Sequence, residues 1–257
     1  MVVLVGDDGS EGAASAVAWA SSFAAERSLK LVVVGVGDPG DTDDPPEAER
    51  ITLPAGHPAS EIMQTAADVE ADLVVLGRRG AGGFPSMPIG TTAHVIAGSC
   101  GRPVAVVPTG FRPRREPLVG RVVVGLDGLR GSALALEWAA SAFPDAHFSL
   151  VHALEAGPSL TWAGGDDAKD VELTRGARSA QMHEWCSVLH EVGASYDTVI
   201  EAGGVAEVLL DTARDRDADA VVVGRHDHGA LRGTLGGVSQ RVLAYAPCPA
   251  VVMPSRW

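Results

Sequence analysis

Short, almost uninterrupted apolar runs alternate along the chain with longer segments in which apolar residues recur at helical spacing. In the first part of the chain, the runs predict strands over residues 2–6, 29–37, 51–56, 71–77 and 103–108. The segments between them predict helices over residues 10–28, 58–70 and 91–99. Because the runs show little polar alternation, they are typical of parallel strands that are covered on both faces. The order of strands and helices therefore predicts a doubly wound α/β layer.

The same pattern occurs a second time. Residues 5–20 match residues 124–139 without gaps, and both stretches pass from Asp-Gly into an alanine-rich segment that ends in Trp-Ala. Residues 55–78 align with residues 202–225, again without gaps. A repeat of this length indicates a duplicated structural unit.

The duplication predicts two tandem domains, residues 1–109 and 119–257, joined by a linker over residues 110–118 that is rich in Gly, Pro and charge. The units differ between their second and third strands. In the second unit, residues 161–193 contain apolar positions near helical spacing, which predict a long amphipathic helix: Leu173, Ala177, Ala180, Met182, Trp185 and Leu189. The first unit has only residues 38–50 there, too rich in Pro, Gly and Asp for such a helix, so it is expected to lack one crossover helix.

Composition and charge narrow the function classes. The chain is 46% hydrophobic and 21% charged, with a net charge of -13, which disfavours broad contact with nucleic acid or anionic lipid. The basic run at residues 112–116 is interpreted as a solvated linker and not as a nucleic-acid arm. The apolar runs are too short to span a membrane and the N-terminus has no basic start, so a cytoplasmic protein is expected. Three scattered cysteines predict reduced thiols without a metal site.

A glycine-rich stretch follows the fourth predicted strand of the first unit. Gly77, Gly80 and Gly90 form the pattern Gly-x2-Gly-x9-Gly-Thr, with the first at a strand end and the last at a helix start. In doubly wound sheets, ligands bind beyond the carboxyl ends of the strands, which places this loop at the ligand edge. Glycines allow close backbone approach, and a helix start favours an anion. A merely flexible loop is the alternative.

The side chains around these glycines suit phosphate. Thr91 and Thr92 offer hydroxyl donors at the first helical positions, and Arg78 and Arg79 add positive charge. The pattern is neither a Walker loop nor a dinucleotide Gly-x-Gly-x-x-Gly, and no nucleophile elbow or paired carboxylates accompany it. We therefore expect this loop to bind a phosphate group, and no catalytic residue is assigned.

The combination of VGDDGS, LGRRGAGGFPSMPIGTT and RPVAVVP resembles the universal stress protein family, and the resemblance covers nearly the whole chain as two units. It implies a five-stranded, Rossmann-like parallel sheet in each unit, pairing of the units through their last strands, and ATP or AMP, with or without Mg²⁺, in the first unit. The binding residues that it implies are Asp8, Val34, Val36, Gly77, Gly80, Gly90, Thr91 and Thr92. Arg78 is added to them because of its positive charge beside the loop, and slow ATP hydrolysis is left open.

Asp8 has two interpretations from the residues alone. A carboxylate at the carboxyl edge of a strand can accept hydrogen bonds from a ribose or an adenine amino group. It can equally cap the helix that is expected to start near residue 10 or 11. Asp7 is expected to be a bystander, because Asp127 in the second unit aligns with Asp8.

The second copy of the loop has lost features that phosphate needs. Asp227 stands where the first copy has Gly80, the loop is one residue shorter between Gly224 and Gly236, and Gly237 replaces Thr91. A carboxylate near a triphosphate is repulsive, so the second site is expected to bind ATP weakly or not at all, although Asp127 remains there. His226, Asp227 and His228 could be imagined as a metal site, but residues this close in sequence rarely converge on one ion without further ligands, so a polar loop tip without metal is expected.

These observations predict an adenine-nucleotide-binding stress-response protein that acts as a sensor or regulator through an unidentified protein partner. The competing hypothesis is a structural or interaction module on the same duplicated fold that binds no nucleotide. The resemblance implies a pseudo-dimer within one chain. A further dimer of chains is left open.

Overall fold

The computed structural model describes residues 1–37, 45–54, 56–82, 87–112, 117–154, 182, 185–225, 235–255 and 257. In the first half, the strands are β1 (Val2–Asp7), β2 (Lys30–Val36), β3 (Glu49–Leu53), β4 (Leu73–Gly77) and β5 (Val104–Val107). The helices of this half are α1 (Glu11–Glu26), α2 (Pro58–Asp68) and α3 (Thr91–Ser99). Each strand and helix predicted for the first unit is therefore present, within a few residues of its expected ends.

The second half repeats this order. Its strands are β6 (Arg121–Gly125), β7 (His147–Leu154), β8 (Tyr196–Ala202), β9 (Ala220–Gly224) and β10 (Ala250–Met253). Its described helices are α4 (Arg130–Ala142), α6 (Ser187–Val192), α7 (Val205–Asp215) and α8 (Gly237–Tyr245). The predicted domain boundaries at residues 109 and 119 fall between β5 and β6, and they stay a prediction.

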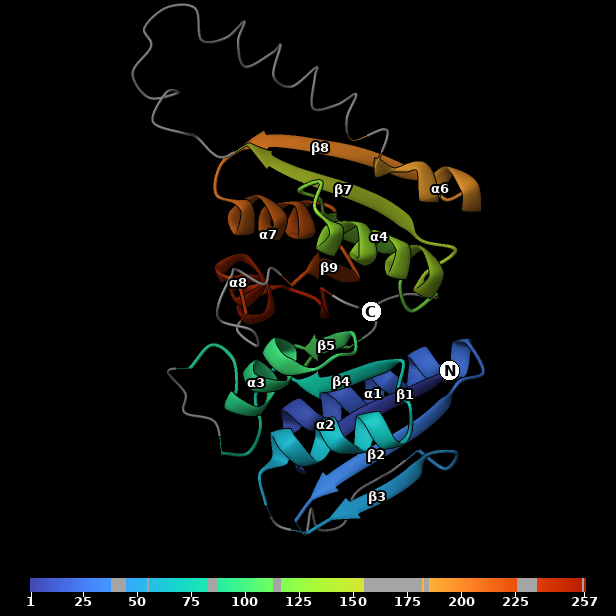
Figure 1. The fold of residues 1–257 in the computed structure, drawn as a ribbon, viewed down its shortest axis with the longest axis vertical. Helices are drawn as coiled ribbons and strands as arrows, with labels where there is room; N and C mark the ends of the chain where they lie inside the picture. Colours follow the sequence, from blue (N-terminus) through green and yellow to red (C-terminus); the bar gives the residue numbers. More distant parts are fainter. Residues whose placement is uncertain are drawn as a thin grey trace, which may run out of the picture.

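One ten-stranded sheet runs through both halves in the order β3-β2-β1-β4-β5-β10-β9-β6-β7-β8 (Figure 1). Neighbouring strands are parallel within each half, as the uninterrupted apolar runs predict. The halves meet where β5 and β10 pair antiparallel, with Ala105 opposite Val251. Pairing through the last strands is thereby confirmed, and one chain forms a pseudo-dimer.

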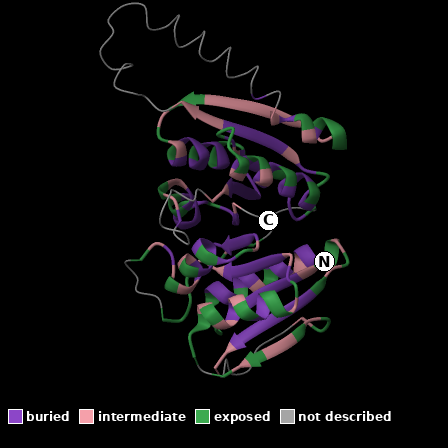
Figure 2. Ribbon diagram, viewed as in Figure 1, coloured by how far each residue is buried: buried purple, intermediate pink, exposed green. Residues whose placement is uncertain are grey.

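Helices cover both faces of the sheet, which explains why its strands lack polar alternation. Val3 and Val5 face the core beneath α1, whereas Leu4 between them faces the core beneath α2 and α3. The second half repeats the arrangement, with α4 and α6 on one face and α7 and α8 on the other. Figure 2 shows the inner strands as largely buried, while the outer strands β3 and β8 are mostly intermediate or exposed.

The two halves differ between their second and third strands, as expected. In the first half, the described residues between β2 and β3 form no helix, and residues 38–44 lie outside the description. In the second half, α6 ends the predicted amphipathic segment, and Met182 and Leu189 are fully buried beneath it. Trp185 is partly buried against the same core, while Leu173, Ala177 and Ala180 lie outside the described residues.

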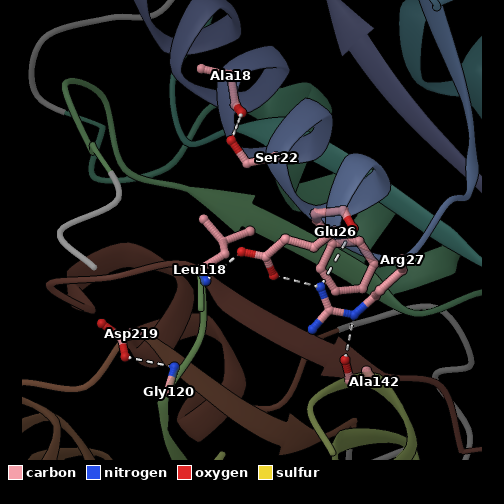
Figure 3. A network of polar contacts seen from close by, with 9 residues as sticks. Ala18, Ser22, Glu26, Arg27, Leu118, Gly120, Ala142 and Asp219 are labelled. Carbon is pink, nitrogen blue, oxygen red and sulfur yellow. Dashed lines mark hydrogen bonds and ion pairs between the residues drawn. The ribbon is translucent and has the colours of Figure 1, made fainter. Parts of the chain in front are cut away.

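Side chains of α1 reach across the seam between the halves (Figure 3). Arg27 donates from Nε to the main-chain oxygen of Ala142 at 2.8 Å, and its guanidinium lies 4.3 Å from the ring centroid of Phe23. Glu26 accepts from the main-chain N–H of Leu118 at 2.6 Å. The seam therefore combines strand pairing with charged hydrogen bonds to main-chain groups, which are stronger than neutral ones.

Candidate functional site

A cavity of about 240 Å³ opens at the carboxyl ends of β1, β2 and β4, next to the start of α3. This is the edge where doubly wound sheets bind ligands. All but one of the residues predicted for the first site line it: Asp8, Val34, Val36, Gly77, Gly80, Gly90, Thr91 and Thr92. The fold thus brings together residues from three stretches that are far apart in the sequence: the end of β1, the end of β2, and the loop between β4 and α3.

The exception is Arg78, which the structure places at the seam and not in the cavity. Its guanidinium donates from Nη2 to the main-chain oxygen of Ala246, just beyond α8 of the second half. Burial lowers the pKa of Arg78 to about 10, with a smaller effect from the charge of Arg79, while Cys248 acts in the opposite direction. Arg78 therefore remains a cation at neutral pH but contacts the other unit. Arg79 lines the cavity instead.

Asp8 ties the end of β1 to the glycine loop. Its Oδ2 accepts a hydrogen bond from the main-chain N–H of Ala81 at 2.8 Å, and its Oδ1 accepts from Ser10 N at 3.1 Å. The cap of α1 is Ser10, whose hydroxyl accepts from Ala13 N at 3.1 Å. The alternative prediction that Asp8 caps this helix is therefore wrong.

Asp7 is a part of the cavity wall that the sequence analysis missed. Its side chain is buried and its Oδ2 lies 2.7 Å from Nη2 of Arg50, on the outer strand β3. Its Oδ1 also accepts from the main-chain N–H of Gly9 at 3.0 Å. The bystander role of Asp7 in ligand binding stays a prediction, because its buried carboxylate is already paired with Arg50, which lies 43 residues away in the sequence.

Two of the loop glycines lie against neighbouring groups, Gly77 against main chain and Gly80 against the side chain of Asp8. A Cβ at Gly77 would lie 2.5 Å from the carbonyl carbon of Gly12, so β4 and the start of α1 touch backbone to backbone. A Cβ at Gly80 would lie 2.2 Å from Oδ2 of Asp8. Gly77 therefore serves helix–strand packing, whereas Gly80 makes room for the carboxylate that holds the loop.

The start of α3 faces the cavity. Gly90 is its N-cap and supplies no side-chain hydrogen bond, while its own N–H donates to the main-chain oxygen of Arg78 at 2.8 Å. Thr91, Thr92 and Ala93 form the first turn and line the cavity. The first N–H groups of a helix have no partner within the helix, and together with the helix dipole they favour an anion.

The second half keeps the packing of this site but not its polar groups. A Cβ at Gly224 would lie 2.5 Å from the carbonyl carbon of Gly131, which repeats the contact of the first half. Asp127, however, accepts from Ser132 Oγ at 2.7 Å and from Leu129 N at 2.8 Å, so its carboxylate is engaged at the start of α4, whose N-cap is Leu129.

The helix that follows the second loop also differs. α8 starts after Gly236 with Gly237 and Val238, where α3 has its two threonines. Asp227 and the flanking His226 and His228 lie outside the described residues. Among the residues that are described, no group of three or more His, Cys, Asp or Glu side chains could hold a metal ion. No described helix is long and apolar enough to cross a membrane.

The model of the universal stress protein family matches residues 41–108 and 119–254. The chain therefore belongs to the universal stress protein family, as two units in tandem. It is 31% identical over 207 residues to the universal stress protein Rv1996 of Mycobacterium tuberculosis, a match that covers 75% of this chain and 62% of that relative. It is 28% identical over 289 residues to Rv2005c of the same species, covering 97% of this chain and 96% of that one.

Solved structures share the tandem fold. A universal stress protein from Archaeoglobus fulgidus superposes with a TM-score of 0.65 at 18% identity, covering 99% of this chain and 98% of its own. A protein from Pseudomonas aeruginosa, PA1789, whose function is described as unknown, superposes with a TM-score of 0.68 at 16% identity, covering 98% of this chain and 92% of its own. At these identities the likeness concerns the fold.

Proposed function

We propose that the first unit binds one adenine nucleotide, ATP, and that the protein acts as a stress-response sensor or regulator through a protein partner. The observation that carries the proposal is the meeting of the α3 start, the Gly80 loop and the Asp8 carboxylate around one cavity. Family membership adds the adenine nucleotide as the ligand class that the sequence resemblance implies.

The phosphates belong at the start of α3 in this proposal. The amides of the first turn, the hydroxyls of Thr91 and Thr92, and the guanidinium of Arg79 are the groups in the cavity wall that attract an anion. Asp8 is the exposed carboxylate of the wall. Mg²⁺, which prefers carboxylate and phosphate oxygens, would offset its repulsion of a triphosphate.

In this proposal, the adenine base lies between apolar side chains of the cavity. Val34 and Val36 lie at the end of β2, and Ile62 of α2 and Leu76 of β4 line the same cavity. Ligand cavities of this kind combine an apolar lining with a few placed polar groups. Asp7 is already neutralised by Arg50, so its charge does not oppose the nucleotide.

The second unit is proposed not to bind ATP under the same conditions. Its first helical positions lack the two hydroxyls, and Asp127 is engaged with α4. Asp227 adds negative charge to the loop. The proposal therefore assigns one nucleotide to each chain.

Binding is tested on the full chain by extracting purified protein and separating the extract by chromatography, followed by titration with ATP, AMP and GTP. The proposal expects adenine nucleotides to bind and GTP to compete poorly. Failure of both ATP and AMP to bind at millimolar concentration would leave the duplicated fold as an interaction module.

A further inference from the structure

The helix α3 contacts the cavity at one end and the second unit at the other. At its start, Thr91 and Thr92 line the cavity. At its end, Nη1 of Arg225 donates to the main-chain oxygen of Cys100 at 2.9 Å and approaches that of Ala97 at 3.5 Å. Arg225 directly follows β9, so a residue of the second unit contacts the carbonyls at the end of α3 in the first.

The contact has a counterpart across the seam. Arg78 follows β4 as Arg225 follows β9, and it donates to the oxygen of Ala246 at the end of α8. Both arginines are anchored through their own main chain, since Arg78 N donates to Val107 O at 2.8 Å and Arg225 N donates to Met253 O at 2.7 Å. The main chain of each arginine is therefore fixed to a central strand, and its side chain extends from there to the end of a helix in the other half.

We propose that Arg225 is a positioning residue for the nucleotide site of the first unit, an inference that rests on the proposed function. α3 has nine residues, a length at which an isolated helix is marginal in water, so its place depends on its buried face and on the contacts at its ends. At its start the main-chain bond from Gly90 N to Arg78 O holds it. At its end the Arg225 cation satisfies terminal carbonyls and complements the helix dipole.

This arrangement couples the two units. A nucleotide at the start of α3 and Arg225 at its end stabilise the same helix, so each strengthens the other, as linkage requires. The contact also gives Arg225, at the start of the second loop, a role that does not require phosphate binding in the second unit. Arg225 remains useful to the chain even though Gly237 and Val238 have replaced the threonine positions.

The inference is tested with Arg225→Met in the full chain, using ATP affinity and hydrogen exchange of α3 in nucleotide-free protein. The expected result is at least about fivefold weaker ATP binding and faster exchange over residues 91–97. Arg225→Lys, which keeps the positive charge but not the planar guanidinium, is expected to recover part of both losses. Unchanged affinity and exchange in Arg225→Met would overturn the inference.

Arg27→Met is the matched control, because Arg27 also donates across the seam to a main-chain oxygen, that of Ala142, away from α3. It should leave ATP affinity and α3 exchange near those of the unmodified protein. Equal losses in both methionine variants would mean general weakening of the seam and would overturn the inference. If the unmodified protein binds no ATP, the proposed function fails. The exchange of α3 in Arg225→Met then still shows whether Arg225 holds this helix.

Discussion

The carboxylate of Asp8 accepts a hydrogen bond from the main-chain N–H of Ala81, with 2.8 Å between Oδ2 and N. The two residues are 73 positions apart, at the end of β1 and in the loop after β4. Both residues are exposed, and the carboxylate makes this a charge-assisted hydrogen bond. The contact therefore links the loop to the sheet edge, and a side chain at Gly80 would displace the Asp8 carboxylate from it.

Gly80→Asp is expected to abolish measurable ATP binding to the first unit. Its Cβ would lie 2.2 Å from Oδ2 of Asp8, and the new carboxylate would face both Asp8 and the phosphates. One like-charge pair at 4 Å with an effective dielectric of about 20 costs about 4 kcal/mol, or roughly three decades in affinity. Equilibrium competition with labelled ATP measures the loss.

Gly101→Ala, whose Cβ meets nothing within 4 Å, is the control. Unchanged affinity in Gly80→Asp would refute this loop assignment.

Gly12→Ala is expected to destabilise the first unit and weaken its nucleotide site. The added Cβ would lie 2.0 Å from the main-chain oxygen of Arg79, which cannot move without moving the loop. Overpacking of this kind costs about 1–3 kcal/mol of unfolding free energy. At the aligned position, Gly131→Ala places its Cβ 3.4 Å from the oxygen of Arg225 and should be neutral or stabilising by up to about 1 kcal/mol. Denaturant unfolding compares them, and equal effects would contradict the packing argument.

Ser10→Ala is expected to lower the free energy of unfolding by about 1 kcal/mol, because Ser10 caps α1 through its hydroxyl. The second unit has Leu129 at this position and no side-chain cap. Leu129→Ser should therefore stabilise α4 by a similar amount. Thermal unfolding should show a lower melting temperature for Ser10→Ala and a higher one for Leu129→Ser. A destabilised Leu129→Ser protein would show that Leu129 has another role.

Asp197 on β8 should make stability depend on acid pH. Burial by itself raises the pKa of this carboxyl, but hydrogen bonds from His147 and Ser149 and the charge of Arg216 outweigh it, so the pKa lies below its usual value. A depressed folded pKa contributes stability that is present above the unfolded value, about 3.9, and is lost as the pH falls through the folded one. The Asp197→Asn protein should have a lower free energy of unfolding at neutral pH, and that free energy should fall less steeply below about pH 4. An identical acid profile would contradict this.

The strands and helices follow from the hydrophobic pattern, because each short apolar run had to be covered on both faces. The close match between residues 5–20 and 124–139 likewise made the duplication readable. The cavity also contains most of the expected side chains, since Gly77, Gly80 and Gly90 mark where strand, loop and helix meet.

What the sequence could not supply was the direction of individual side chains. Arg78 and Arg79 are neighbours with the same charge, yet one reaches Ala246 in the other unit and the other lines the cavity. Alternation of side chains at a strand end separates two such neighbours, but it does not say which faces the ligand. Asp7 was missed for a related reason: its partner Arg50 becomes a neighbour only when β3 joins the sheet.

Isothermal titration calorimetry of the full chain with ATP tests the central claim most directly, because it reports affinity and stoichiometry together. The account predicts one site per chain, in the first unit, and no second site of comparable affinity. Two equivalent sites per chain, or no binding of ATP, would contradict it.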